Sequence, residues 1–259
     1  FNETVGAREG IEVKAVSKDS VSSLAESVIS AVNDEPGADN PPDIFATYAE
    51  TAYILDQKGA LTDLSQYFTD EELSEYVDGY IEEGMFGNDG SLKIFPTAKS
   101  TEIMMLNATE WEKFSKEYKQ SVDSLKTWEG LCEVAQMYYI YTDELTPDIK
   151  NDGKAFFGRD SVANYMIVGA AQLGNEFIKT DSGKAILNID KGTVRRLWDC
   201  YYVPYVSGYF TAKGRYRSDD IKTGEIVSMV CSTTGAVYFP DKVTINDDYT
   251  YKMECSFGE

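Results

Sequence analysis

The chain contains no histidine among its 259 residues. Without imidazole it cannot form a Ser-His-Asp or Cys-His relay, an HExxH zinc site, a C2H2 zinc finger or a histidine pH switch. The sequences GxGxxG, GxxxxGK[ST], DxDxDG and GxSxG are absent as well, which removes the common nucleotide-binding, calcium-binding and hydrolase motifs. We therefore expect neither a bound metal nor a cofactor.

Basic residues are also scarce, with 24 Lys and Arg against 44 Asp and Glu and a formal net charge of -20. A nucleic-acid-binding protein needs clustered positive charge to displace counterions from phosphates, and anionic lipid headgroups repel an acidic surface. We expect no nucleic-acid partner and no docking on a membrane surface. Strong net charge keeps a protein soluble and monomeric, so a monomer is expected.

Long apolar runs are missing too, since none approaches the ~18 residues that span a bilayer. The chain begins at Phe1 without a basic and then apolar leader, so we expect that an export signal has already been removed. The four cysteines are far apart and form no CxxC pair, which predicts buried free thiols rather than a disulfide framework or a zinc site. They are Cys132, Cys200, Cys231 and Cys255.

The first 60 residues show a β-α-β-α pattern. Alternating apolar residues predict a strand over 11–15, and apolar residues at helical spacing predict a helix over 21–32. A second short buried strand is predicted at Asp43–Ala46, followed by a helix over 53–58 that ends at Gly59. Two strands joined by a crossover helix form a right-handed parallel unit, so this half is predicted to be α/β.

The rest of the chain is predicted to be richer in helices. A capping box at residues 69–72 begins a helix that runs toward Gly84, and Asn88-Asp89-Gly90 predicts a hairpin turn. Further predictions are strands at 92–95, 101–106 and 226–231, helices starting at 128 and spanning 161–173 and 193–205, and a loop at 232–235. An α/β half followed by a helix-rich half predicts two lobes.

Two kinds of residue cluster are candidates for chemistry. Paired carboxylates at 70–72 or 82–83 could flank a glycosidic bond as acid and base, but solvated first turns of helices are the stronger interpretation. Arg195-Arg196 is interpreted as an ion-paired helix face rather than an anion site. The segments 46–50 and 232–236 each follow a predicted strand, where ligands bind in open α/β sheets.

An ordered series of segments resembles the extracellular solute-binding proteins of family 1, the group that includes the maltose-binding proteins. The series is Pro42-Asp43-Ile44-Phe45-Ala46, Gly59-Ala60-Leu61-Thr62-Asp63-Leu64, Phe95-Pro96-Thr97-Ala98-Lys99-Ser100-Thr101, Leu106-Asn107, Thr127-Trp128-Glu129 and Gly224-Glu225-Ile226-Val227-Ser228-Met229. No single segment is decisive, whereas their order and spacing across nearly the whole chain make the resemblance specific.

The resemblance implies an α/β, two-lobe, periplasmic-binding-protein-like fold of type II, here incomplete at both ends. The lobes are expected at residues 1–97 and 98–241, and residues 242–259 are expected to begin the return to the first lobe. Such a protein binds a small solute between its lobes, closes by a hinge and delivers the solute to an ABC permease in the membrane. We expect an extracellular or periplasmic location with a lipid anchor on a preceding segment, and no enzymatic activity.

The resemblance also implies site residues. They are Thr47, Tyr48 and Glu50, then Lys99, Ser100 and Thr101, then Arg159, Asp160, Ser161 and Tyr165, and finally Ser232, Thr233, Thr234 and Val237. Maltodextrin-binding relatives carry a tryptophan at the position of Val237 and an acid at that of Ser100, which argues against maltose itself.

Carboxylates, an arginine and tyrosine rings suit a carbohydrate, which is the leading expectation for the ligand. Lys99 and Arg159 beside a Ser/Thr/Gly loop would equally suit an anionic solute such as a glycerol phosphate. A carbohydrate-active enzyme with paired carboxylates is the alternative of another class.

Overall fold

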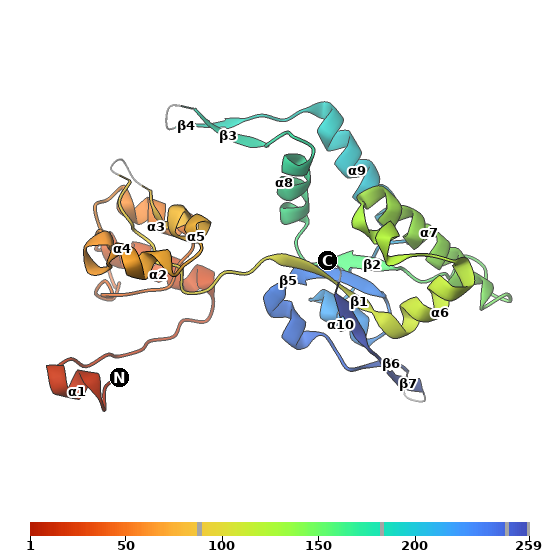
Figure 1. Ribbon diagram of the computed structural model, residues 1–259, viewed down its shortest axis with the longest axis horizontal. Coiled ribbons are helices and arrows are strands. Elements are labelled where there is room, and N and C mark those ends of the chain that lie inside the picture. The colour runs from red at the N-terminus through yellow and green to blue at the C-terminus, as the bar shows by residue number, and fades with distance from the viewer. Residues whose placement is uncertain (87–89, 182–183, 247–248, 258–259) are drawn as a thin grey trace. The chain divides into compact units, whose positions relative to one another are not determined.

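The computed structural model describes residues 1–86, 90–181, 184–246 and 249–257. Its contacts divide the chain into two units, residues 1–99 and residues 100–259 (Figure 1). The predicted hairpin turn at Asn88-Asp89-Gly90 falls mostly outside the described residues. Among the described residues, no helix is both long enough and apolar enough to cross a bilayer.

The second unit is built on a four-stranded sheet with the strand order β2-β5-β1-β8. β5 (Ser228–Ser232) runs parallel to β2 (Phe157–Arg159) and antiparallel to β1 (Glu102–Asn107). β8 (Cys255–Phe257) pairs with the other edge of β1. β1 and β5 confirm the strands predicted at 101–106 and 226–231.

Side chains on β1 and β5 alternate between two cores because successive residues of a strand point to opposite faces. Leu106 and Met104 pack in the larger core, which also holds the aromatic side chains of α6 (Ala108–Tyr118) and α7 (Trp128–Glu144). Met105, Met229 and Cys231 pack on the opposite face with residues of α10 (Arg217–Lys222) and β6 (Lys242–Asn246). Burying each such side chain contributes about 1.5–3 kcal/mol, so both layers hold the sheet in place.

The second unit also contains helices and two β-hairpins. The helical elements of the second unit are α6 (Ala108–Tyr118), η2 (Val122–Lys126), α7 (Trp128–Glu144), α8 (Val162–Gln172), α9 (Lys191–Val206), α10 (Arg217–Lys222) and η3 (Thr233–Tyr238). The hairpins are β3 (Ile178–Asp181) with β4 (Lys184–Leu187), and β6 (Lys242–Asn246) with β7 (Tyr249–Lys252). The helices predicted at 128, 161–173 and 193–205 are confirmed as α7, α8 and α9. The last turn of α9 includes Pro204.

The first unit consists of short helices around a small core. They are α1 (Val5–Glu9), α2 (Val21–Val32), α3 (Ala49–Asp56), η1 (Ser65–Tyr67), α4 (Asp70–Ser74) and α5 (Asp78–Gly84). Val28, Ala52, Leu55, Ile81 and Leu92 are among the buried apolar side chains of this unit. The helix at 21–32 is confirmed, and so is the capping box, in which Thr69 and Glu72 bond each other's backbone N–H groups. The helix that it begins is interrupted, however, between α4 and α5.

The strands predicted in the first unit are wrong. Residues 11–15 and 43–46 have no strand structure, and Val13 and Ile44 are 54% and 91% exposed. The segment 92–95 forms no strand either, beyond a single bridge between Met85 and Leu92. A strand needs a neighbour for its backbone groups, and the described part of this unit offers no sheet. Instead, the Asn2 side-chain amide bonds both backbone groups of Val13, each at 2.8 Å.

The segment from 242 onward lies in the second unit. Here β6 and β7 form a hairpin, and β8 extends the sheet beside β1. That this segment begins a return to the first lobe stays a prediction, as do the expected lobe boundaries.

Candidate functional site

Three strand ends meet at one edge of the second unit's sheet. β2 and β5 are parallel and therefore end together, while the antiparallel β1 begins there. The Asp160 N–H donates to the Val230 carbonyl at 3.2 Å, and the Thr233 N–H donates to the Thr101 carbonyl at 2.8 Å. The structure thus brings together six predicted site residues, which we call the strand-end edge: Thr101, Asp160, Ser161, Ser232, Thr233 and Thr234.

Arg159 ends β2 just beneath this edge and is 4% exposed. Its guanidinium forms an ion pair with Glu102, which lies on β1. The second oxygen of Glu102 accepts a hydrogen bond from the Asn164 amide at 3.1 Å. The Arg159 guanidinium also lies over the rings of Trp128 and Tyr165, 5.8 and 5.5 Å from their centroids. The positive charge is buried and neutralised, so Glu102 rather than Arg159 reaches solvent at the edge.

Asp160 is held in a similar way by a second buried arginine. Its Oδ1 accepts from the Arg217 backbone N–H at 2.9 Å and lies 3.6 Å from the Arg217 Nε. The Arg217 guanidinium is itself paired with buried Asp220 at 2.7 Å and donates to the Gly214 carbonyl at 2.5 Å. The Asp160 side chain nevertheless remains 34% exposed. The edge therefore presents carboxylates to solvent and keeps its arginines behind them.

Hydroxyl and apolar groups complete the edge. Ser161 caps α8 by accepting from the Asn164 N–H at 3.1 Å. The predicted loop after β5 is instead the 3-10 helix η3, on which Thr234 is exposed and Val237 is 78% exposed. Tyr238, which is 64% exposed, was not predicted. The sequence signal that could have found Tyr238 is its position next to Val237, a predicted ligand residue.

The remaining predicted residues lie elsewhere. Thr47, Tyr48 and Glu50 are at the beginning of α3 in the first unit, where Tyr48 is 63% exposed. Lys99 ends the first unit and pairs with Glu83. Ser100, the first residue of the second unit, is exposed.

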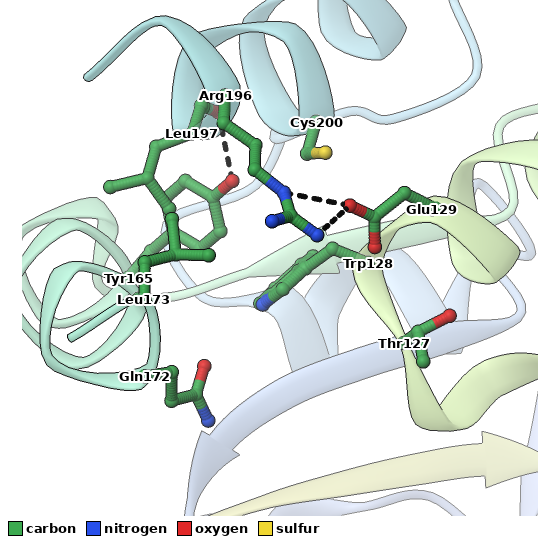
Figure 2. A pocket seen from close by; sticks show the side chains of 10 residues that line it. Thr127, Trp128, Glu129, Tyr165, Gln172, Leu173, Arg196, Leu197 and Cys200 are labelled. Atoms are coloured by element: carbon green, nitrogen blue, oxygen red, sulfur yellow. Dashed lines mark hydrogen bonds and ion pairs between the residues drawn. The ribbon is translucent and has the colours of Figure 1, made fainter. Parts of the chain in front are cut away.

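Tyr165 is 1% exposed and donates its hydroxyl to the Leu197 carbonyl at 2.8 Å. Burial raises its pKa. Its ring packs edge-on against Trp128 at 4.5 Å. It lines a pocket of about 150 Å³ between α7, α8 and α9, shown in Figure 2.

The sequence did not reveal this pocket. At the side of the pocket, the Arg196 guanidinium forms an ion pair with Glu129 at 2.6 Å. Arg195 pairs with Asp199 at 2.7 Å, so the prediction that Arg195-Arg196 is an ion-paired helix face is confirmed. The pocket-lining residues are Thr127, Trp128, Glu129, Tyr165, Gly169, Gln172, Leu173, Arg196, Leu197 and Cys200.

Comparison with known proteins identifies the family. A sequence model of the bacterial extracellular solute-binding proteins matches residues 1–252. The chain belongs to this family. The predicted resemblance is therefore confirmed, and the family is one of proteins that bind solutes outside the cytoplasm. A search of curated proteins finds no match.

One solved structure supports the same fold for this solute-binding protein. UgpB from Mycobacterium tuberculosis, in complex with glycerophosphocholine, superimposes with a TM-score of 0.66 at 18% sequence identity. The match covers 90% of this chain and 56% of UgpB, so the chain spans little more than half the length of that protein. The predicted α/β fold of the solute-binding class is confirmed.

Metal binding has no support in the part of the chain that the structure describes, where no group of three or more acidic or cysteine side chains could hold an ion.

Proposed function

We propose that this chain is the solute-recognition component of an ABC importer, that it binds a neutral polyhydroxylated solute, a carbohydrate, and that its strand-end edge contacts that solute. One observation carries the proposal: the carboxylates of Glu102 and Asp160 reach solvent, while Arg159 and Arg217 are each only 4% exposed. Sugar hydroxyls donate hydrogen bonds, and a carboxylate acceptor makes such bonds stronger than neutral ones.

The rest of the edge fits the same class of solute. Hydroxyl groups of Ser232, Thr233 and Thr234 can both donate and accept. Exposed Tyr238 and Val237 offer apolar contact to the face of a sugar ring. Several features stay predictions from the resemblance. They are a lipid anchor on the chain, a membrane permease as its partner, a direct solute contact by Arg159, and solute contacts by Thr47, Tyr48, Glu50, Lys99 and Ser100.

A second candidate is a glycerophosphodiester, because UgpB was solved with glycerophosphocholine. A phosphate would need an exposed cation, and the two arginines behind the edge are buried and paired. The quaternary ammonium of a choline headgroup, in contrast, would suit carboxylates beside the exposed ring of Tyr238. A glycerol phosphate without a choline group fits the edge less well, because it brings the phosphate without the cation that would suit the carboxylates.

A thermal-shift panel of neutral sugars, glycerol phosphate and glycerophosphocholine tests the proposal. A solute whose free concentration is a hundred times its Kd stabilises the folded state by about 2.7 kcal/mol, which raises Tm. Asp160→Asn should weaken the solute's affinity by about tenfold or more, because a charged hydrogen bond is lost. Asp199→Asn is the matched control, since Asp199 pairs only with Arg195 on α9 among the ion pairs described, and it should leave affinity unchanged.

The outcomes separate the candidates. A rise in Tm with glycerophosphocholine alone supports the second candidate against the first. Hydrolysis of chromogenic glycosides, abolished by acid-to-amide changes, would instead establish the carbohydrate-active enzyme.

A further inference from the structure

Two cysteines that are far apart in the sequence lie against each other in the second unit. Cys132 is on α7 and Cys200 is on α9, 68 positions later. The Cys132 Sγ donates to the Cys200 carbonyl oxygen at 3.1 Å. The other two cysteines, Cys231 and Cys255, are on β5 and β8 with β1 between them.

The pocket between α7, α8 and α9 reaches Cys200, one member of this pair. Cys200 is one of its lining residues, and Figure 2 shows the sulfur beside the pair formed by Arg196 and Glu129. A small organic disulfide that enters the pocket would therefore meet the Cys200 sulfur first, with Cys132 in place to react second.

We propose that Cys132 and Cys200 form a disulfide that links α7 to α9 in the exported protein. The family acts outside the cytoplasm, where disulfides form and persist. The inference rests on the fold and the family, and not on which solute the strand-end edge binds.

The reaction is thiol–disulfide exchange with an external disulfide as the oxidant. The Cys200 thiolate attacks one sulfur of the oxidant, whose S–S bond breaks, and the first oxidant thiol leaves. The Cys132 thiolate then attacks the Cys200 sulfur of the mixed disulfide, forming the new S–S bond and releasing the second oxidant thiol. The two protons lost by the cysteines end on the two released thiols. The two cysteines are oxidised by two electrons and the oxidant is reduced by the same two.

The burial of the two thiols determines the rate of this reaction. Burial raises the pKa of the Cys132 thiol to about 12 and also raises that of Cys200. Because the thiolate is the attacking species, oxidation should be slow at neutral pH and faster at mildly alkaline pH. The reduced form is therefore long-lived enough to be compared with the oxidised one.

Peptide mapping of the native chain after incubation with 2-hydroxyethyl disulfide, a small organic disulfide, tests the proposal. After blocking of the free thiols and digestion with trypsin, we expect peptides 127–150 and 197–213 to be joined, with Cys231 and Cys255 alkylated. Oxidation should raise Tm by on the order of 5–10 °C, because the closed loop is long. Cys132→Ser and Cys200→Ser should each abolish this rise, and the control Cys231→Ser should keep it.

Three results would overturn the proposal. One is alkylation of Cys132 and Cys200 with no linked peptide after prolonged oxidation. Another is a link that involves Cys231 or Cys255. The third is an unchanged rise in Tm in the Cys132→Ser variant. A failed solute panel would leave all three readouts intact, so the disulfide and the solute are tested separately.

Discussion

The guanidinium of Arg159 pairs with the carboxylate of Glu102 from the other side of β5, which lies between their two strands. The arginine side chain is 3% exposed and the glutamate side chain is 25% exposed. The pair therefore has a buried end and a solvent end. This arrangement fixes the orientation of a carboxylate at the strand-end edge and makes its removal costly, because the arginine would then be left buried without its partner.

Glu102→Ala should accordingly destabilise the second unit by about 2–4 kcal/mol. Arg159→Met should cost less, because it removes the buried charge and keeps apolar contact with Trp128 and Tyr165. Urea unfolding followed by tryptophan fluorescence measures both, since Trp111, Trp128 and Trp198 all lie in the second unit.

The double variant provides the control. With both partners removed, no buried charge is left, so its stability should be close to that of Arg159→Met alone. Simple addition of the two single effects would show that the residues do not act as a pair.

Gly158 is required by the close packing beneath the edge. A Cβ at this position would lie 2.6 Å from the Thr211 carbonyl oxygen and 2.9 Å from the Arg217 Cδ. Gly158→Ala should therefore displace Arg217 from Asp160 and destabilise the unit by about 1–3 kcal/mol. Gly192→Ala is the comparison, because a Cβ there would meet only the Asp190 carboxylate, at 3.0 Å or more. Equal urea midpoints for the two variants would contradict this prediction.

Thr127 begins α7 as its N-cap. Its hydroxyl accepts from the Gly130 N–H at 3.1 Å. Thr127→Ala should lower the free energy of unfolding by about 1 kcal/mol, while Thr127→Ser should keep the cap and most of the stability. The same fluorescence measurement applies. A Thr127→Ser variant as unstable as Thr127→Ala would show that the threonine methyl group, and not the hydroxyl, holds the helix start.

The sequence predicted the second unit better than the first, and the reason is physical. Helices α7, α8 and α9 depend on local periodicity and capping, which one segment carries by itself. The same holds for the helix over 21–32, which was also predicted correctly in the first unit. The strands at 11–15 and 43–46 depend on a partner strand, and alternation of side chains does not say whether that partner is present.

The site shows the same contrast. Thr233 was predicted to follow a strand, and it does follow β5. Asp160 was placed only by the resemblance, because no strand was predicted at β2. The burial of Arg159 was not predictable, because its partner Glu102 is 57 positions away and only the strand order brings them together. The contact between Cys132 and Cys200 was missed for the same reason, since it arises from packing of α7 on α9.

The reduced protein should lose stability at alkaline pH through its buried thiols. Burial raises the pKa of Cys132 to about 12 and that of Cys231 to about 11, from 9.0. The folded state therefore holds these protons more tightly than the unfolded state. The stabilising contribution is complete below pH 9 and is lost as pH rises from 9 through 11 to 12.

Thermal melts under reducing conditions at pH 8 and pH 10, values chosen to lie below and above about pH 9, should show this loss as a fall in Tm. The Cys132→Ser/Cys231→Ser variant should show a smaller fall, because serine does not titrate in this range. The comparison between the two proteins removes the effects of lysine and tyrosine, which titrate equally in both. An equal fall in the two proteins would mean that thiol burial contributes nothing to the alkaline limit of stability.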